Sequence, residues 1–236
     1  MIHYHGLPIT PEEVAVAVLK ARHAFVSFAH RSQINIASQV CQSFAIDNGA
    51  YSFWKSGKKV DWGDYYTFLE GVKNNPRFDF AVVPDVIEGS EKENDALLLG
   101  FPLNKFYSVP VWHLHESIGR LKALAEGYPR IAFGSSGEYS TVGNAQWSDR
   151  MDEAFSEIVD SRGMPVVKVH GLRMLNPKVF TRYPFSSVDS TNIARNVGID
   201  KKWKGTYQPA SKKVRGLVLA DRIENHTSPD TFIRRI

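Results

Sequence analysis

The sequence predicts an α/β protein folded as a (β/α)8, TIM-like barrel, in a single domain that spans residues 1–236. Helix-like and strand-like segments alternate in seven or eight β-α repeats, and the strands are continuous apolar runs, which indicates a parallel sheet covered on both faces. Several of these runs also end in polar or glycine-rich tips, as expected where barrel strands meet their loops. An open, doubly wound sheet is the alternative, and it would bind its ligand where the strand order reverses.

The first helix is predicted over 14–22, because Thr10 precedes Pro11 at the first helical position and Glu12 and Glu13 occupy the first turn. The elements that follow alternate. Apolar runs predict strands over 24–29, 43–47, 78–85, 106–112, 130–134, 165–170 and 186–189. The segments between them predict helices over 32–42, 63–74, 90–100, 116–128, 147–162 and 177–183.

Composition places the chain among soluble globular proteins. It has 236 residues, of which 43% are hydrophobic, enough to bury a substantial core. Its apolar stretches are shorter than the about 18 residues of a membrane span, and its start lacks the pattern of a secretion signal, so we expect a cytoplasmic protein that contacts no membrane. The single cysteine, Cys41, excludes an internal disulfide and a cysteine-rich zinc site, and we expect it to pack.

Positive charge is concentrated near the C-terminus, although the net charge of +4 is modest for a nucleic-acid-binding protein. Trp203 and Tyr207 interrupt this basic segment. A basic segment with interspersed aromatic residues suits a phosphate backbone, and a solvated loop is the alternative. The basic residues are Lys201, Lys202, Lys204, Lys212, Lys213 and Arg215.

Three aspartates end predicted strands, which would place them together at one edge of the barrel. Asp47 lies in Ile-Asp47-Asn-Gly-Ala-Tyr, Asp85 follows Val-Val-Pro, and Asp189 follows Phe-Ser-Ser-Val. Carboxylates around one cavity repel one another, so at least one should have a raised pKa and be available as a proton carrier. The alternatives are structural, namely an Asx-type turn at Asp47 and a cap at Asp85 for the helix that starts near Ser90.

Histidines follow other predicted strands. His113 and His115 flank a leucine, and His170 ends a later strand. Together with Asp189 they could ligate a metal ion, which gives the rival hypothesis of a metal-dependent barrel hydrolase. A non-catalytic nucleic-acid-binding module is a second rival.

Glycines and aromatic residues complete the set of candidate features. The segment Gly134-Ser135-Ser-Gly offers consecutive backbone N–H groups for a carbonyl or an anion, although a plain loop has the same composition. Tyr51 or Phe53 could stack on a base. We expect packing roles for Trp54, Trp62, Tyr65, Tyr66 and Phe68.

Taken in order, these motifs resemble those of the tRNA-guanine transglycosylase superfamily, and most closely its branch, often virus-encoded, that inserts 7-deazaguanine bases into DNA. The family's Asp-Ser-Gly-Gly-Phe element corresponds to Asp47-Asn-Gly-Ala-Tyr51, its next aspartate to Asp85, and its glycine-rich segment to 132–137. Its nucleophile segment, in which an aspartate leads into Thr-Arg-Asn-Ala-Arg-Asn, corresponds to Asp189-Ser-Thr-Asn-Ile-Ala-Arg-Asn196. These matches span residues 47–196.

The resemblance implies an enzyme that replaces guanine in double-stranded DNA with a 7-deazaguanine base, with the target base flipped out and no cofactor. It implies Asp189 as the nucleophile toward the anomeric carbon and Asp47 as a second catalytic residue. Base-binding roles are expected for Asp85, Gly134, Ser135, His113, His170 and Tyr51. Phosphate-binding roles are expected for Arg195, Asn196, Lys201, Lys202 and Lys204. If the protein is virus-encoded, its compartment is the host cytoplasm.

The chain also departs from this family. The tRNA-modifying members carry a C-terminal zinc site of three cysteines and a histidine, which a chain with one cysteine cannot build. We therefore expect a barrel without the zinc subdomain. The family's glutamine after the fourth strand is replaced near Trp112-His113, which leaves the identity of the incoming base open.

Overall fold

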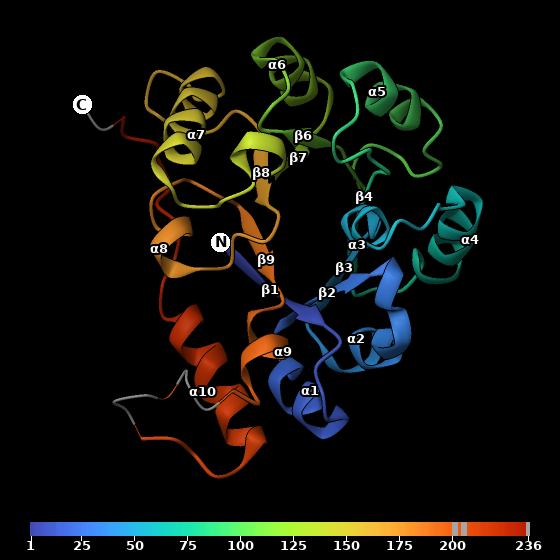
Figure 1. The fold of residues 1–236 in the computed structure, drawn as a ribbon, viewed down its shortest axis with the longest axis vertical. Helices are drawn as coiled ribbons and strands as arrows, with labels where there is room; N and C mark the ends of the chain where they lie inside the picture. Colours follow the sequence, from blue (N-terminus) through green and yellow to red (C-terminus); the bar gives the residue numbers. More distant parts are fainter. Residues whose placement is uncertain (200–202, 204–206, 235–236) are drawn as a thin grey trace.

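A computed structural model of the chain describes residues 1–199, 203 and 207–234. Parallel strands form one sheet that curves into a ring, and helices surround it (Figure 1). The strand order is β5-β4-β3-β2-β1-β9-β8-β7-β6. The strands are β1 (Ile2–Leu7), β2 (His23–Ser27), β3 (Ser43–Asp47), β4 (Phe78–Val82), β5 (Ser108–Val109), β6 (Val111–His113), β7 (Arg130–Gly134), β8 (Lys168–Gly171) and β9 (Ser187–Ser190).

The sheet closes because β5 and β6 are two halves of one strand. They stand at opposite ends of the strand order, and only Pro110, which has no amide hydrogen, separates them in the chain. The Val83 N–H donates to Val109 O (3.0 Å) on one side, and the Ala132 N–H donates to Pro110 O (2.8 Å) on the other. With β5 and β6 counted as one, the 9 strands become 8, the number of a (β/α)8 barrel. The predicted TIM-like fold is confirmed, and the open-sheet alternative is wrong.

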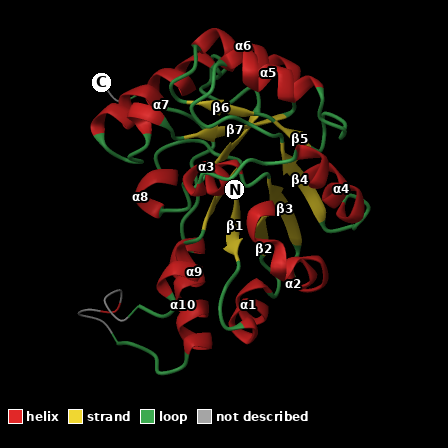
Figure 2. Cartoon of the chain, turned by 45° about the vertical axis from the view of Figure 1, so that its right-hand side comes forward, coloured by secondary structure: helices red, strands yellow, loops and turns green. Residues whose placement is uncertain are grey.

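The longer helices lie outside the ring (Figure 2). Asp61 caps α4, Ser117 caps α6 and Asn144 caps α7, each by accepting a backbone N–H of the first turn. Ser90 and Glu93 form a complete capping box at α5. The helices are α1 (Glu12–Leu19), α2 (Ile34–Val40), α3 (Ala50–Ser56), α4 (Trp62–Val72), α5 (Glu91–Leu99), α6 (Ile118–Gly127), α7 (Ala145–Glu157), α8 (Pro177–Phe180), α9 (Asn192–Asn196) and α10 (Lys212–Glu224), with 3-10 turns η1 (Phe28–Gln33) and η2 (Gly137–Tyr139).

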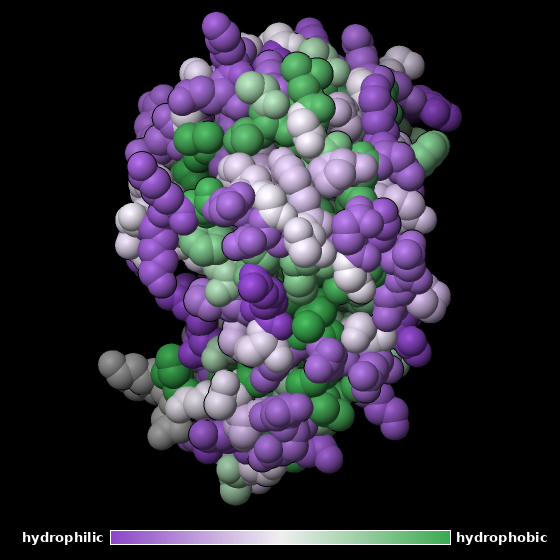
Figure 3. All heavy atoms as spheres, turned by 90° about the vertical axis from the view of Figure 1, so that its right-hand side faces the viewer, coloured by the Kyte–Doolittle hydropathy of each residue, from purple (hydrophilic) through white to green (hydrophobic). Residues whose placement is uncertain are grey.

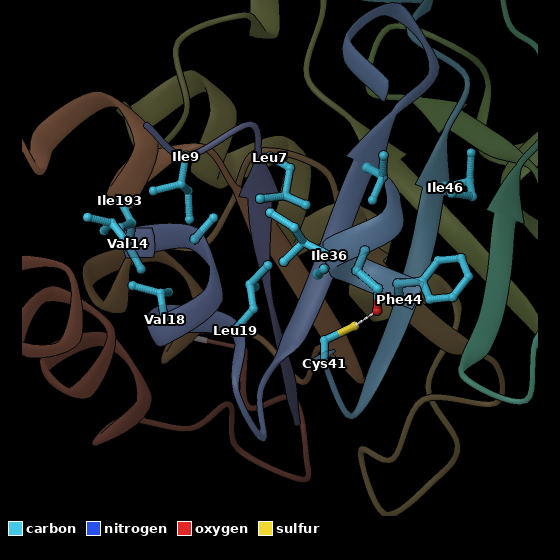
Figure 4. Close-up of a cluster of buried hydrophobic side chains, with 14 of the residues drawn as sticks. Leu7, Ile9, Val14, Val18, Leu19, Ile36, Cys41, Phe44, Ile46 and Ile193 are labelled. Atoms are coloured by element: carbon cyan, nitrogen blue, oxygen red, sulfur yellow. Dashed lines mark hydrogen bonds between the residues drawn. The ribbon is translucent and has the colours of Figure 1, made fainter. Parts of the chain in front are cut away.

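Apolar side chains fill two layers, one inside the ring and one between the ring and the helices. The outer layer includes Leu7, Val18, Ile36 and Cys41 (Figure 4). The Cys41 thiol donates to Ala37 O, and burial raises its pKa to about 11, so the predicted packing role is confirmed. The inner layer consists of Tyr4, Phe25, Ala45, Phe80, Val82, Val109, Val111 and Ala132.

The outer surface is mixed in character. On the side shown in Figure 3, hydrophilic side chains cover much of the surface, and hydrophobic side chains form smaller areas between them. Within the described residues, none of the helices combines the length and the apolar character required to cross a bilayer.

The sequence prediction missed β1 and the helices α3, α9 and α10. β1 alternates, with Tyr4 inside the ring and His5 on its outer side, where His5 Nε2 lies 2.7 Å from Glu224 Oε1 of α10. The two histidines of this strand concealed its apolar face. Asp189 therefore lies in the last of the strands and pairs with Tyr4 of β1. Several predicted bounds also change. β4 ends at Val82, so Asp85 lies in the loop after the strand and does not end it. β8 begins only at Lys168, α7 ends at Glu157 and α8 ends at Phe180.

Candidate active site

A cavity of about 850 Å³ opens at the carboxyl ends of the strands. The order of parallel strands brings together side chains that are far apart in the chain, as expected for this fold. The lining includes every predicted catalytic and base-binding residue except His170, which is fully buried, and it also includes Arg195 and Asn196. These lining residues are Asp47, Tyr51, Asp85, His113, Gly134, Ser135, Asp189, Arg195 and Asn196.

Asp47 ends β3 and is the carboxyl group whose acidity is most altered. Burial among the strand ends raises its pKa to about 7, and the negative charges of Asp189 and Asp85 add to this rise. Its Oδ2 also accepts the Gly49 N–H (3.1 Å), so the Asx-type turn and the carboxylate cluster are both present. The expectation that at least one carboxyl of the group has a raised pKa is met at Asp47.

Asp85 is buried and held by an amide and an imidazole. Asn48 Nδ2 donates to Asp85 Oδ1 (2.6 Å), and His113 Nε2 lies 2.8 Å from Asp85 Oδ2. The alternative role as a helix cap is wrong, because Ser90 and Glu93 cap α5 themselves. Asp85 is thus oriented toward the cavity by two fixed side chains.

His113 belongs to a hydrogen-bonded chain that leads away from Asp85. Its Nδ1 lies 3.2 Å from Ser136 Oγ, which in turn lies 2.9 Å from His115 Nδ1, and the two histidine rings stack at 5.6 Å. Gly134 makes room for this ring, because a Cβ at that position would lie 2.8 Å from His113 Nδ1. Close approach, rather than an unusual backbone angle, therefore requires glycine here.

A buried ion pair fixes the backbone of His113 from behind. Glu116 Oε2 accepts the His113 N–H (2.8 Å) and lies 2.6 Å from Arg120 Nη1. Asn94 Nδ2 donates to the other oxygen of Glu116 (2.8 Å). Sequence reasoning missed this support, although Glu116 and Arg120 stand four residues apart at the start of a predicted helix, a spacing that favours pairing.

Asp189 is buried at the end of β9 and is held through one carboxylate oxygen. Its Oδ1 accepts the Arg173 N–H (2.9 Å) and lies 3.3 Å from His170 Nε2. None of the described residues donates a hydrogen bond to Oδ2. His170 is fully buried among the aromatic rings inside the barrel, and its Nδ1 lies 2.8 Å from Ser187 Oγ. His170 Nε2 forms no hydrogen bond with a described residue, and His170 does not line the cavity, which corrects its predicted base-binding role.

Arg173 is a site residue that the sequence did not reveal. Its backbone is left-handed, with φ at 61°, which turns its N–H toward Asp189. Its guanidinium donates to Ser135 O (2.6 Å) and lies 4.2 Å from the centre of the Tyr51 ring. Arg173 thus connects three loops of the cavity.

The predicted phosphate-binding residues fall into two groups. Arg195 is exposed at the cavity and forms no ion pair with a described residue, whereas Asn196 uses its amide within α9, where Nδ2 donates to Asn192 O (2.7 Å). Lys201, Lys202 and Lys204 lie outside the described residues.

The aromatic residues of the basic segment differ from each other. Trp203 is buried, with the Arg222 guanidinium 4.9 Å from its ring, so its predicted place beside a phosphate backbone is wrong. Tyr207 is exposed.

The residues of the rival metal site do not form one group. His113 and His115 are bound to Asp85 and Ser136, while His170 lies with Asp189 in the barrel interior. In the described part of the chain, no three His, Cys, Asp or Glu side chains are arranged to hold a metal ion.

Comparison of the chain with protein-family models, curated proteins and solved structures gives no match.

Proposed function

We propose that this protein is a base-exchange transglycosylase that replaces guanine in DNA with a 7-deazaguanine derivative through a covalent intermediate on Asp189. The supporting observation is the convergence of Asp47, Asp85 and Asp189 from separate strands on one cavity, with the pKa of Asp47 raised to about 7. The cavity of about 850 Å³ is within the usual size for a small-molecule site, about 300–1,000 Å³.

In the first half of the reaction, Asp189 Oδ2 attacks C1′ of the target nucleotide. The C1′–N9 bond breaks, its electron pair leaves with guanine, and Asp47 supplies the proton that makes guanine a neutral leaving group. The C1′–Oδ2 ester carries no negative charge. Because the charge of Asp189 raises the pKa of Asp47, ester formation makes Asp47 a stronger acid when its proton is needed.

The second half reverses these steps with a different base. The incoming 7-deazaguanine loses its N9 proton to the Asp47 carboxylate, N9 attacks C1′, and the ester bond breaks to restore the Asp189 carboxylate. The returning charge raises the pKa of Asp47 again and retains the proton. The exchange therefore balances in protons and bonds without an added cofactor.

The base would be recognised by side chains and backbone amides whose positions are already fixed by other residues. Asp85, held by Asn48 and His113, would accept hydrogen bonds from the N1–H and 2-amino group that guanine and 7-deazaguanine share. Backbone N–H groups of the Gly134–Ser135 segment border the same cavity and would donate to O6, and Trp147 Nε1 holds Ser135 Oγ at 2.9 Å.

The test is incorporation of labelled guanine into mixed-sequence DNA, with tRNA as a parallel substrate, followed by denaturation to detect covalently attached nucleic acid. Asp189→Asn should lower exchange at least ~10⁴-fold and abolish the adduct, because amide oxygen is a poor nucleophile. The matched control is Asp64→Asn, an exposed aspartate on α4 outside the cavity, which should retain full exchange.

Undiminished exchange by Asp189→Asn would overturn the mechanism. Exchange into tRNA alone would overturn the assignment of DNA. Unaltered DNA binding by a protein that never exchanges a base would leave a nucleic-acid-binding module.

A further inference from the structure

Two aromatic side chains of α3 are exposed beside the cavity. Tyr51 is 38% exposed and Trp54 is 48% exposed, and their ring centres lie 5.8 Å apart. The expectation that Trp54 packs is therefore wrong, whereas Tyr65 is fully buried as expected. A large apolar surface at the mouth of a site, beyond the reacting groups, indicates a further contact with the ligand.

The position of α3 is set by the turn that presents Asp47. Gly49 has φ at 80°, a left-handed conformation that lets the helix start three residues after Asp47, at Ala50. α3 then lies inside the ring of outer helices (Figure 1), and Tyr51 and Lys55 line the cavity.

The helix that carries the pair is anchored on two sides. Phe53 packs on Phe28 of the layer between the ring and the helices, with ring centres 6.2 Å apart. On the cavity side, the Arg173 guanidinium lies 4.2 Å from the Tyr51 ring centre. A helix placed in this way lowers the conformational entropy lost when a ligand stacks on the exposed rings.

Cations follow the aromatic pair directly in the chain. Lys55, Lys58 and Lys59 are exposed, and none of them forms an ion pair with a described residue. Arg195 of α9 lines the same cavity. Phosphate groups on both sides of a nucleotide in the cavity would therefore meet positive charge.

We propose that Tyr51 and Trp54 form a stacking wedge that occupies the gap in a DNA duplex when the target nucleotide enters the cavity, with Lys55, Lys58 and Lys59 on the adjoining phosphates. This inference rests on the proposed function. An extruded nucleotide leaves its neighbours unstacked, and aromatic side chains recover that stacking irrespective of sequence. The wedge should matter for duplex DNA and not for single strands, where no stacked gap has to be filled.

The first experiment uses a DNA duplex with an abasic site next to 2-aminopurine, whose fluorescence falls when a ring stacks on it. The wild-type protein should quench this signal, Trp54→Ala should lose most of the quenching, and Trp54→Phe should retain it. Phe106→Ala, which removes an exposed aromatic ring before β5 at the other end of the barrel, is the matched control. No quenching by the wild type, or equal quenching by Trp54→Ala, overturns the wedge whether or not any base is exchanged.

The second experiment compares exchange into duplex and single-stranded DNA of the same sequence. Trp54→Ala should lower exchange about tenfold or more on the duplex and less than about twofold on the single strand. Because Trp54 is half exposed, circular dichroism should show an intact fold. An equal loss on both substrates overturns the wedge, and absence of exchange by the wild type on every substrate overturns the proposed function instead.

Discussion

At the carboxyl ends of the strands, acidic side chains face other acidic side chains, whereas at the amino ends they are paired with basic ones. Asp47 carries a raised pKa beside Asp85 and Asp189. At the opposite end, Asp79 at the start of β4 lies 3.2 Å from Arg130 at the start of β7 and accepts a hydrogen bond from the Tyr4 hydroxyl.

Further paired charges lie at the amino ends of the strands. Arg22 lies 2.8 Å from Glu224 and 2.6 Å from Asp221, and Glu224 also contacts His5. Paired charges hold the barrel together, while a cluster of like charges costs stability and persists where chemistry needs it. The acidic side chains that line the cavity thus lie near one another, whereas those at the amino ends, like Glu116 behind the cavity with Arg120, are paired with basic groups.

The largest effect is expected from the removal of a reactive charge. Asp47→Asn should lower base exchange by about 10²–10⁴-fold, because the proton carrier is lost. The same change should stabilise the fold, since it removes a buried group that repels its neighbours. Exchange assays and urea unfolding measure the two effects, and a less stable Asp47→Asn protein would contradict the account.

The pH dependence of that stabilisation follows from the raised pKa. Folded Asp47 titrates near 7 and unfolded aspartate near 4, so the wild-type protein loses stability as the pH rises through this interval. The stability advantage of Asp47→Asn should be small at pH 4 and reach up to about 4 kcal/mol above pH 7. Asp64→Asn, measured beside it, should show no such trend.

A smaller effect is expected from removing a structural charge. Arg130→Ala should reduce the free energy of unfolding by about 1–3 kcal/mol, because Asp79 loses its cationic partner and Phe80 loses the guanidinium 4.5 Å from its ring centre. Exchange should stay within about twofold of wild type. Arg162→Ala, at an exposed surface pair, serves as the control for both measurements. A fold of unchanged stability with impaired exchange would show that the amino end takes part in the reaction.

The sequence predicted the barrel and the carboxylate cluster for the same reason. Parallel strands place their carboxyl ends at one edge, so the apolar runs that end at Asp47, Asp85 and Asp189 were enough to bring these residues together. Only periodicity and strand direction were needed. β1 was not predicted, because its outward-facing histidines interrupt the apolar pattern that marks the other strands.

The remaining site residues depend on tertiary contacts that no local pattern encodes. Arg173 reaches Asp189 only through a left-handed backbone, and it reaches Ser135, 38 residues away, only because β7 and β8 are neighbours. The exposure of Trp54 depends on how α3 is seated, and aromatic residues at helical spacing are usually packed. The contacts of Arg173 and the exposure of Trp54 could therefore be identified only from the structure.

The coupling of Asp47 to the charge of Asp189 can be measured directly by titrating Asp47. The chemical shift of its carboxyl carbon reports this titration in the wild-type protein and in Asp189→Asn. The account predicts a midpoint near pH 7 in the wild type and a lower midpoint in Asp189→Asn, because one of the charges that raise the pKa is gone. A wild-type midpoint near pH 4, or one that Asp189→Asn leaves unchanged, would contradict it.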